Sequence, residues 1–234
     1  NVTIRVHIHY DLRNFSPHRR RNYNVSLGKQ IRLNRIFGHE TGRLCSLAVD
    51  HLVAYQRGLP EGLRNVPETI DLLVKGKPDA ITMYKGMAQY AWQPHAGSIP
   101  LIIPSIAFSL DDAVMHQMAR PHECIRLGAD AISAAIALRS KREGDYLKML
   151  TTIVEEAAQY DLPVIAHIYP RDFSGEPKVV HDPENILYAV RCGIELGADA
   201  IKVPYTGDVQ SFREIVATSP VPVVAAGGPK TNTL

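Results

Sequence analysis

One lysine stands inside an apolar stretch that otherwise has the composition of a buried strand. Residues 197–208 read GADAIKVPYTGD, and Lys202 is the charged member of the strand that the first seven residues predict. A buried ammonium is costly, so either its stem packs while the amine reaches water, or the amine works as a neutral nucleophile. Desolvation lowers the pKa of an amine, which is what a lysine needs to form a Schiff base with a carbonyl substrate.

A tyrosine and a histidine share one face of the preceding strand pattern. In the run VIAHIYP, the alternation of a strand puts Ile165, His167 and Tyr169 on the same side. Tyr169 ends the run before a proline, where its hydroxyl could move protons for a reaction at Lys202, although it could also cap the core as an amphipathic side chain. His167 then either supports the site from behind or packs as a neutral histidine.

Two other strand ends carry residues that suit a phosphorylated substrate. Asp50 follows the run LCSLAV, where a buried carboxylate needs a partner, unless it only ends the strand by accepting local N–H groups. Gly227 and Gly228 end the run VVAAGG, and paired glycines allow backbone N–H groups to approach an anion, although they could also form a simple tight turn. The ten histidines include one H-x-H, at residues 7–9, but no H-E-x-x-H, and no other spacing supports a zinc site, so we expect neither a metal nor a cofactor.

Short apolar runs predict the strands that must hold these residues in place. Three of the runs begin with a turn followed by Asp-Ala-Ile, and most are apolar almost throughout, as in a parallel sheet covered on both faces. The predicted strands lie within residues 44–51, 78–86, 99–107, 128–137, 162–170, 197–207 and 221–228.

Helical patterns separate several of these runs. Residues 143–161 place apolar side chains at helical spacing, and residues 211–219 predict a shorter helix. A helix over residues 182–197 begins with Asp182 as its N-cap and Pro183 in its first turn, and stops at Gly197. Residues 26–38 predict a helix ahead of the first strand, where it could plug the bottom of a barrel.

Alternating strands and helices place the chain in the α/β class, with a parallel sheet. The first strand is not followed by G-x-G-x-x-G, which counts against a dinucleotide-binding sheet, whereas polar residues at the strand ends favour a (β/α)8 TIM barrel. Such a barrel needs one more unit after Gly228. We therefore expect a TIM barrel over residues 26–234 that is truncated after its seventh strand, and a basic, disordered N-terminal arm over residues 1–25.

Composition narrows the possible partners. With 45% hydrophobic and 21% charged residues the chain is an ordinary globular protein, and a net charge of +2 gives no reason to expect nucleic acid. No apolar run of 18 residues predicts a membrane span. Three widely spaced cysteines are typical of a reducing cytosol, where thiols serve as small buried hydrophobes, so we expect a cytoplasmic protein.

Together these segments resemble the archaeal-type class I aldolases. The resemblance covers about residues 26–234 and rests on GRLCSLAVDH, YKG, IYPRD, GADAIKVPYTGD and VPVVAAGGPKTNT. That family of (β/α)8 enzymes includes class I fructose-bisphosphate aldolase, 2-amino-3,7-dideoxy-heptulosonate synthase and the autoinducer-2 phospho-thiolase. Here Leu52 stands where the family usually has glycine, and the third and fourth strands match poorly.

The resemblance implies a role for each candidate residue. Lys202 would form the Schiff base, Tyr169 would donate and accept protons, and Asp50 would orient the substrate and assist proton transfer. The expected substrate-binding residues are Gly227, Gly228, Lys85 and His167.

The expected activity is that of a class I aldolase, a carbon–carbon lyase that acts on phosphorylated ketoses without a metal or cofactor. Fructose bisphosphate, a substrate of glycolysis and gluconeogenesis, is the first expected substrate, and a heptulosonate-type transaldolase or synthase reaction is the alternative. A non-catalytic fragment that keeps the fold is a further alternative, motivated by the missing strand and Leu52. The expected partners are a small sugar phosphate and other copies of the chain in a homo-oligomer.

Overall fold

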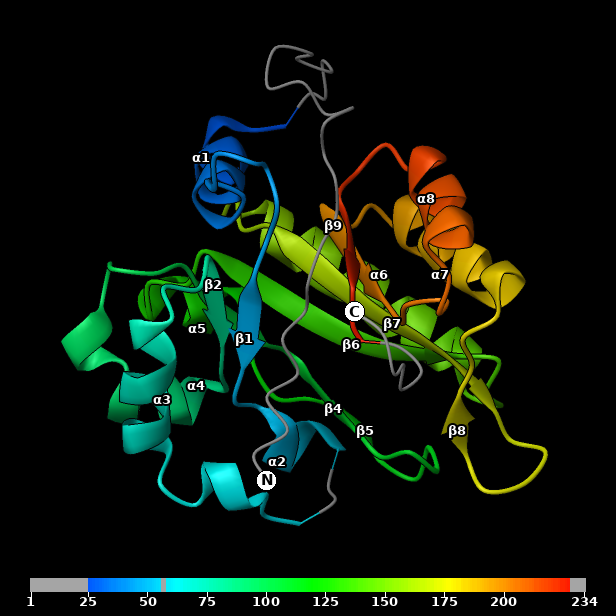
Figure 1. Cartoon of the computed structure of the whole chain (residues 1–234), viewed down its shortest axis with the longest axis horizontal. Helices are drawn as coiled ribbons and strands as arrows, with labels where there is room; N and C mark the ends of the chain where they lie inside the picture. Colours follow the sequence, from blue (N-terminus) through cyan, green and yellow to red (C-terminus); the bar gives the residue numbers. More distant parts are fainter. Residues whose placement is uncertain (1–24, 56–57, 228–234) are drawn as a thin grey trace.

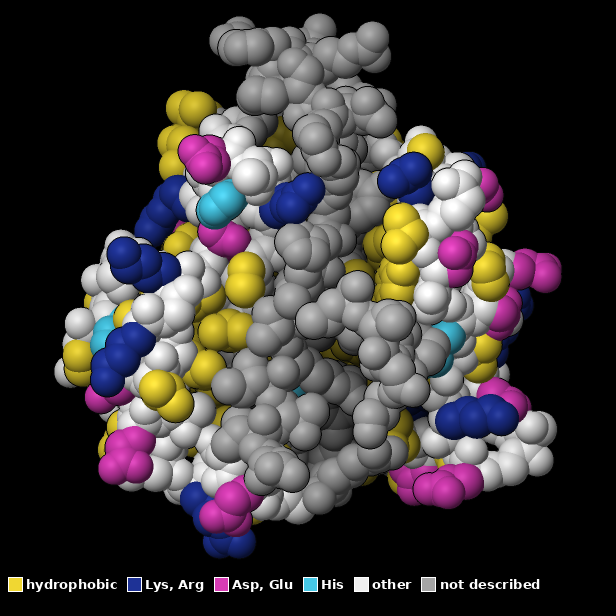
Figure 2. Space-filling model, in the orientation of Figure 1, with side chains coloured by type: hydrophobic (Ala, Val, Ile, Leu, Met, Phe, Trp, Pro, Cys, Tyr) yellow, Lys and Arg dark blue, Asp and Glu magenta, His cyan; other side chains and the backbone are white. Residues whose placement is uncertain are grey.

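A mostly parallel sheet, curled into part of a barrel with helices on its outside, forms the frame of the molecule (Figure 1). It is seen in a computed structural model that describes residues 25–55 and 58–227. The expectations for the N-terminal arm and for Gly228 lie outside these residues. On the face in Figure 2, acidic and basic side chains are interspersed over the described elements.

The strand order follows the sequence. Neighbours in the order β1-β2-β3-β6-β7-β9-β10 pair in parallel. Each predicted run overlaps one of these strands, although β6 and β7 extend one and two residues beyond their runs, so the prediction of a seven-stranded sheet of the TIM-barrel type is confirmed for the described residues. The strands are β1 (Ser46–Ala48), β2 (Ala80–Thr82), β3 (Leu101–Pro104), β6 (Ala131–Leu138), β7 (Val164–Asp172), β9 (Ala200–Val203) and β10 (Val223–Ala225).

Helices fill the connections between the strands. They are α1 (Leu27–Ile36), α2 (His51–Tyr55), α3 (Val66–Lys75), α4 (Lys85–Ala91), α5 (Pro121–Arg126), α6 (Glu143–Ala158), α7 (Pro183–Glu195) and α8 (Val209–Ala217), with 3-10 turns at Glu61–Leu63 and Gln93–His95. The Asp182 carboxylate caps α7, as predicted, by accepting the Asn185 N–H at 3.0 Å. Helix α8 begins two residues before its predicted start, because Asp208 caps it in the same way. No helix among the described residues is long and apolar enough to cross a membrane.

The repeated Asp-Ala-Ile segments fasten each strand to its neighbour. In each segment the aspartate accepts a hydrogen bond from one backbone N–H on the neighbouring strand or at its entrance, and its own N–H returns a bond to the carbonyl of the same residue. The pairs are Asp79 with Cys45, Asp130 with Leu101 and Asp199 with Val164, and their N–H to carboxylate distances are 2.6, 3.0 and 2.8 Å. A buried N–H is costly to leave unbonded, so each aspartate fixes the register at the start of its strand.

Helix α1 covers the end of the sheet where the strands begin, as the predicted plug requires. Ile36 is fully buried there and packs into a separate small core formed with Leu44, Ala80, Ile102, Ala131, Ile165 and Ala200. Two cations of α1 bind aspartates of the repeated segments. Lys29 lies 2.9 Å from the Asp199 carboxylate, and Arg35 lies 2.8 Å from that of Asp130.

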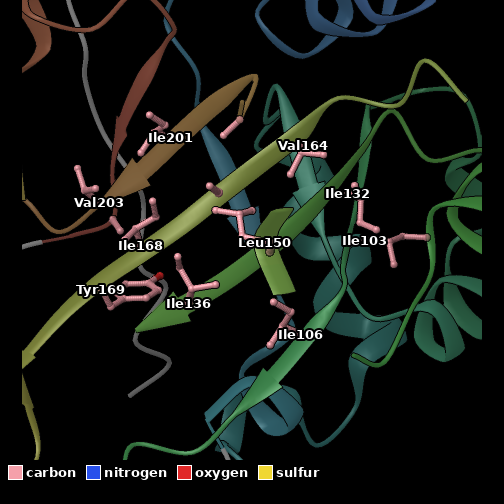
Figure 3. Packing of buried hydrophobic residues seen from close by; sticks show 14 of the residues in the cluster. Ile103, Ile106, Ile132, Ile136, Leu150, Val164, Ile168, Tyr169, Ile201 and Val203 are labelled. Carbon is pink, nitrogen blue, oxygen red and sulfur yellow. The ribbon is translucent and has the colours of Figure 1, made fainter. Parts of the chain in front are cut away.

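A larger core lies between the sheet and its outer helices (Figure 3). Leu150 of α6 packs there with strand residues that alternate with those of the small core, including Ile132, Val164 and Ile201. Because side chains of a strand alternate between its faces, the small core marks the inner face of the barrel, and Ile132, Val164 and Ile201 mark the outer face.

The sequence did not predict two antiparallel additions. Strands β4 (Ile106–Phe108) and β5 (Met115–Gln117) form a hairpin directly after β3, and β8 (Lys178–Val179) pairs with the end of β7. The apolar run at residues 99–107, predicted as one strand, is therefore divided between β3 and β4.

The cysteines behave largely as small core residues. All three are free thiols; Cys124 is buried, and Cys45 and Cys192 are half-buried. Burial raises the pKa of Cys124 to about 12, so this thiol stays protonated at neutral pH.

Candidate active site

Lys202 lies on the inner face of the sheet. Ala200, two residues earlier on β9, belongs to the small inner core, and strand alternation puts Lys202 on the same side. Its register partners on the flanking strands are His167 of β7 and Val224 of β10. Lys202 is half-buried and His167 is 8% exposed, so the structure brings these two predicted residues together inside the barrel.

Tyr169 lies two residues beyond His167 and on the same face of β7. It is 7% exposed, and its ring centroid is 6.2 Å from that of Phe108 in the β4–β5 hairpin. Figure 3 shows Tyr169 beyond the middle of β7, toward the end at which the strand leaves the sheet. This is the end where the barrel architecture assembles reactive side chains.

Asp50 reaches the same space from the first strand of the sheet. Leu44 belongs to the inner core, and the alternation that continues through β1 places Asp50 on the inner face, with a side chain that is 12% exposed. Burial raises the pKa of this carboxyl, against the opposing positive charges of His51, whose Nδ1 lies 3.9 Å away, and Lys202. Strands β1 and β9 are distant in the sheet order, so it is the curl of the sheet that brings Asp50 within electrostatic reach of Lys202.

Gly227 directly follows β10, next to the strand of Lys202. Its φ of +75° lies in the left-handed region, and apart from its chain neighbours no atom of the described residues lies within 4 Å of where a Cβ would be. Its carbonyl accepts the N–H of Tyr205 at 2.6 Å, which ties the loops after β9 and β10 together. The glycine therefore serves the backbone conformation rather than close packing.

Lys85 has a partner on the outer helices. It begins α4, and its ammonium lies 2.6 Å from the Glu123 carboxylate of α5. The hydrogen bonds from Lys85 and from the Arg120 N–H lower the pKa of Glu123, so this carboxylate stays ionised. This contact joins α4 to α5, and the substrate-binding role of Lys85 stays a prediction.

Arg171 is a residue that the sequence reasoning missed. It continues the alternation of His167 and Tyr169 along β7, and only 1% of its side chain is exposed. Its Nη1 donates to the carbonyls of Ser109 and Leu110 and to Asp112 Oδ1, each at 2.9 Å. The sequence pattern could have pointed to this residue, because the segment IYPRD places an arginine two residues after the tyrosine and therefore on the same face of the strand.

The donor set does not suggest a metal centre. Within residues 25–55 and 58–227, no three histidine, cysteine, aspartate or glutamate side chains lie where they could together hold a metal ion. The grouped residues of the inner face are instead an amine, a phenol, an imidazole and a carboxylate. This combination suits covalent chemistry at a carbonyl with proton transfer.

Comparison with known families shows which family the chain belongs to. Residues 44–234 match the model of the DeoC/LacD family aldolases. The chain belongs to this aldolase family. It is 36% identical over 208 residues to 2-amino-3,7-dideoxy-D-threo-hept-6-ulosonate synthase 1 of Archaeoglobus fulgidus, covering 87% of this chain and 74% of the relative. It is 32% identical over 211 residues to class 1 fructose-bisphosphate aldolase of Thermoproteus tenax, covering 85% of this chain and 76% of that enzyme.

Solved structures of aldolases share the fold. An archaeal fructose-1,6-bisphosphate aldolase, with its catalytic lysine bound to the carbinolamine intermediate of the substrate, superposes with a TM-score of 0.73 at 30% identity. The match covers 88% of this chain and 82% of that one. The resemblance to class I aldolases is therefore confirmed, and the aldolase family supports assignment as a lyase. The two relatives at 32–36% identity differ in activity, so the substrate has to be argued from the site.

Proposed function

We propose that this aldolase forms a Schiff base between Lys202 and the ketone of a phosphorylated sugar, and that Tyr169 and Asp50 move the protons. The observation that carries the proposal is that Lys202 and Asp50 both lie on the inner face of the curled sheet, with the carboxylate only 12% exposed and within electrostatic reach of the amine. An amine beside a base, inside a barrel and at the catalytic end of its strands, is the arrangement that a Schiff-base nucleophile requires.

Asp50 fits the first half of the reaction. Because burial raises its pKa, Asp50 is a stronger base than an exposed aspartate and can accept the proton that Lys202 loses before it attacks the carbonyl. The attack forms a C–N bond and gives a carbinolamine. Asp50 returns the proton to the carbinolamine hydroxyl, water leaves, and the product is an iminium ion.

Tyr169 fits the second half. As the C–C bond breaks, its electron pair moves toward the iminium nitrogen, and Tyr169 relays the proton of the reacting hydroxyl to Asp50. An aldehyde leaves and an enamine remains on Lys202. The same relay run backwards protonates the enamine carbon, and water then hydrolyses the iminium, which releases the ketone and returns Lys202 as its ammonium.

Gly227 suits the phosphate of the substrate. The loops that follow the last strands of a barrel of this type are the usual place for a phosphate, and a glycine in the left-handed region lets backbone N–H groups turn toward an anion. The φ of Gly227 meets this requirement. Gly228, the other predicted phosphate residue, lies outside the described residues.

Two substrates follow from the relatives. Fructose 1,6-bisphosphate is supported by the solved archaeal aldolases at 30% identity and by the Thermoproteus enzyme. A heptulosonate-type condensation is supported by the 36% identical Archaeoglobus synthase and by a 29% identical Streptomyces griseus enzyme, 2-amino-4,5-dihydroxy-6-oxo-7-(phosphonooxy)heptanoate synthase. A Schiff base to a ketone suits the joining or splitting of a neighbouring C–C bond in either reaction, so the same residues could serve both.

Covalent trapping tests the chemistry directly. The protein is incubated with dihydroxyacetone phosphate, reduced with borohydride and mapped by mass spectrometry, and the adduct is expected on Lys202. Lys202→Met should remain folded by circular dichroism and give no adduct, whereas Lys148→Met, an exposed change on α6, should be trapped like the wild type. An adduct on another lysine, or no adduct with folded wild-type protein, contradicts the proposal.

Cleavage assays then distinguish the two substrates and test whether the reaction depends on a metal ion. Turnover of fructose 1,6-bisphosphate that is lost in Lys202→Met supports the first substrate. Trapping at Lys202 without such turnover supports the heptulosonate-type reaction. Inhibition by a chelator would instead point to a metal-dependent aldolase.

A further inference from the structure

The hairpin formed by β4 and β5 is held against the end of β7 by one buried arginine. The Arg171 Nη1 donates to three oxygens of the hairpin turn, the carbonyls of Ser109 and Leu110 and the carboxylate of Asp112. Arg171 is 2% exposed and Asp112 is 9% exposed, so water screens this ion pair very little. Charge-assisted bonds to a buried guanidinium are among the stronger contacts in proteins, so the turn has little freedom to move away from β7.

The same turn is also tied to helix α6. The Tyr146 hydroxyl donates to Asp112 Oδ1 at 3.0 Å, and Arg142 donates to the Asp112 carbonyl at 3.2 Å. Burial and the negative charge of Asp112 raise the pKa of Tyr146, so this phenol keeps its proton and remains a donor. The hairpin turn is thus fixed from two directions, by β7 and by α6.

Phe108 packs against Tyr169 and connects it to the fixed hairpin turn. The guanidinium of Arg171 lies 4.5 Å from the centre of the Phe108 ring, and the Tyr146 ring meets Phe108 edge-on at 6.5 Å. The third neighbour of the Phe108 ring is Tyr169, at 6.2 Å. Phe108 is 1% exposed, so it has no open space into which to shift.

We infer that Phe108 is a positioning residue for the reaction, and that Arg171 holds it there through the hairpin turn. This inference rests on the proposed function, in which Tyr169 relays the proton of the breaking C–C bond. Phe108 would fix the plane of the Tyr169 ring, and with it the direction of the hydroxyl. Lys202 lies on the strand next to β7, and the pairing of β9 with β7 and β10 sets its place.

Because Phe108 packs against Tyr169, changing Phe108 should affect proton transfer more than Schiff-base formation at Lys202. Phe108→Leu keeps an apolar side chain in the core but removes the ring against which Tyr169 packs. A displacement of a catalytic group by about 1 Å costs on the order of a hundred-fold in rate. If the Tyr169 ring is held less firmly in its orientation, kcat should fall by at least about ten-fold. Formation of the Schiff base at Lys202 does not depend on the orientation of the Tyr169 ring. The yield of the borohydride-trapped adduct on Lys202 should therefore change by less than about two-fold.

The experiment compares Phe108→Leu with Ile106→Val, a matched core change on the same strand of the hairpin. Ile106 is also 1% exposed, and its carbonyl accepts the Tyr84 hydroxyl at 2.8 Å. Both variants are assayed for cleavage of fructose 1,6-bisphosphate and for borohydride trapping with dihydroxyacetone phosphate, and folding is checked by circular dichroism. If fructose 1,6-bisphosphate is not turned over, release of tritium from labelled dihydroxyacetone phosphate replaces the cleavage assay as the measure of proton transfer.

The inference is supported if Phe108→Leu loses turnover with trapping and KM kept, while Ile106→Val behaves as the wild type. It is overturned if Phe108→Leu turns over at the wild-type rate, or if turnover and trapping fall together in the folded variant. Arg171→Lys is the second variant in case Phe108→Leu does not fold, because a lysine keeps the charge toward Asp112 but loses the planar contact with Phe108. It should lower kcat in the same selective way. Failure of the wild type to be trapped at Lys202 would refute the proposed function itself, a result distinct from all of these.

Discussion

Asp199→Ala is expected to destabilise the fold markedly, because one carboxylate performs two tasks at the start of β9. It accepts the Val164 N–H at 2.8 Å and binds the Lys29 ammonium at 2.9 and 3.0 Å. The first contact sets the register of β9 against β7, which places Lys202 beside His167. The second contact attaches helix α1 to the bottom of the barrel.

The magnitude follows from these contacts. The N–H belongs to a fully buried residue, and removing its acceptor costs about 1–3 kcal/mol. The side chains of Lys29 and Asp199 are 14% and 11% exposed, so their pair is only partly screened and is worth about 1 kcal/mol, the upper end for exposed pairs. Asp199→Ala should therefore cost about 2–4 kcal/mol in the free energy of unfolding. Asp199→Asn keeps an acceptor for the N–H and should cost about 1 kcal/mol.

Urea denaturation followed by circular dichroism measures these values at constant m. Lys29→Met and the double variant Lys29→Met/Asp199→Asn complete a cycle that isolates the ion pair, with an expected coupling of about 1 kcal/mol. Asp79→Ala is the matched control, since it removes the corresponding bond at Cys45, a half-buried residue, and should cost less. A loss below about 1 kcal/mol for Asp199→Ala would refute the assignment of the aspartate as the register clamp.

Two further predictions concern the site itself. Burial raises the pKa of Asp50 in the folded state, so the folded protein holds a proton that the unfolded chain releases, and stability falls as pH rises from the ordinary aspartate range through the raised pKa. Asp50→Asn should abolish this fall and raise the urea midpoint at neutral pH while slowing turnover; an unchanged pH dependence of the midpoint would contradict the assignment. Gly227→Ala forces a side chain into the left-handed region at φ +75°, which should cost about 1–2 kcal/mol and raise KM for phosphorylated substrates, and an unaltered KM would remove Gly227 from the phosphate site.

Much of the sheet could be predicted because its strands are apolar on both faces and are introduced by the same chemistry. Asp130 and Asp199 end the same kind of turn and accept the same kind of N–H, so their similarity in sequence reflects a similarity in structure. Alternation alone could group Tyr169 with His167 and Ile165 on one face of their strand, but that this face and that of Lys202 point inward follows from the small inner core.

The hairpin escaped prediction because apolar residues continue through the point where the chain changes direction. Ser105 separates β3 from β4, and its Oγ donates to the Ala119 carbonyl while its N–H bonds to Ser133. A buried serine between two apolar runs does not reveal these distant partners. The turn at Asp111 and Asp112 did carry a signal, since the Asp111 carboxylate accepts the Ala113 N–H in a local turn.

The contrast between Arg171 and Asp50 separates residues that hold the site from residues that act in it. Arg171 is buried, yet Asp112 and two carbonyls receive its charge, so the fold gains a fixed hairpin from it. Asp50 is also buried, but the attraction of Lys202 and His51 is smaller than the effect of burial, and its pKa remains raised. A neutral side chain would suit the fold better at that position, whereas a carboxylate that takes up protons easily suits a reaction in which a lysine must lose one. The burial of Asp50 is therefore better explained by the chemistry of Lys202 than by the stability of the barrel.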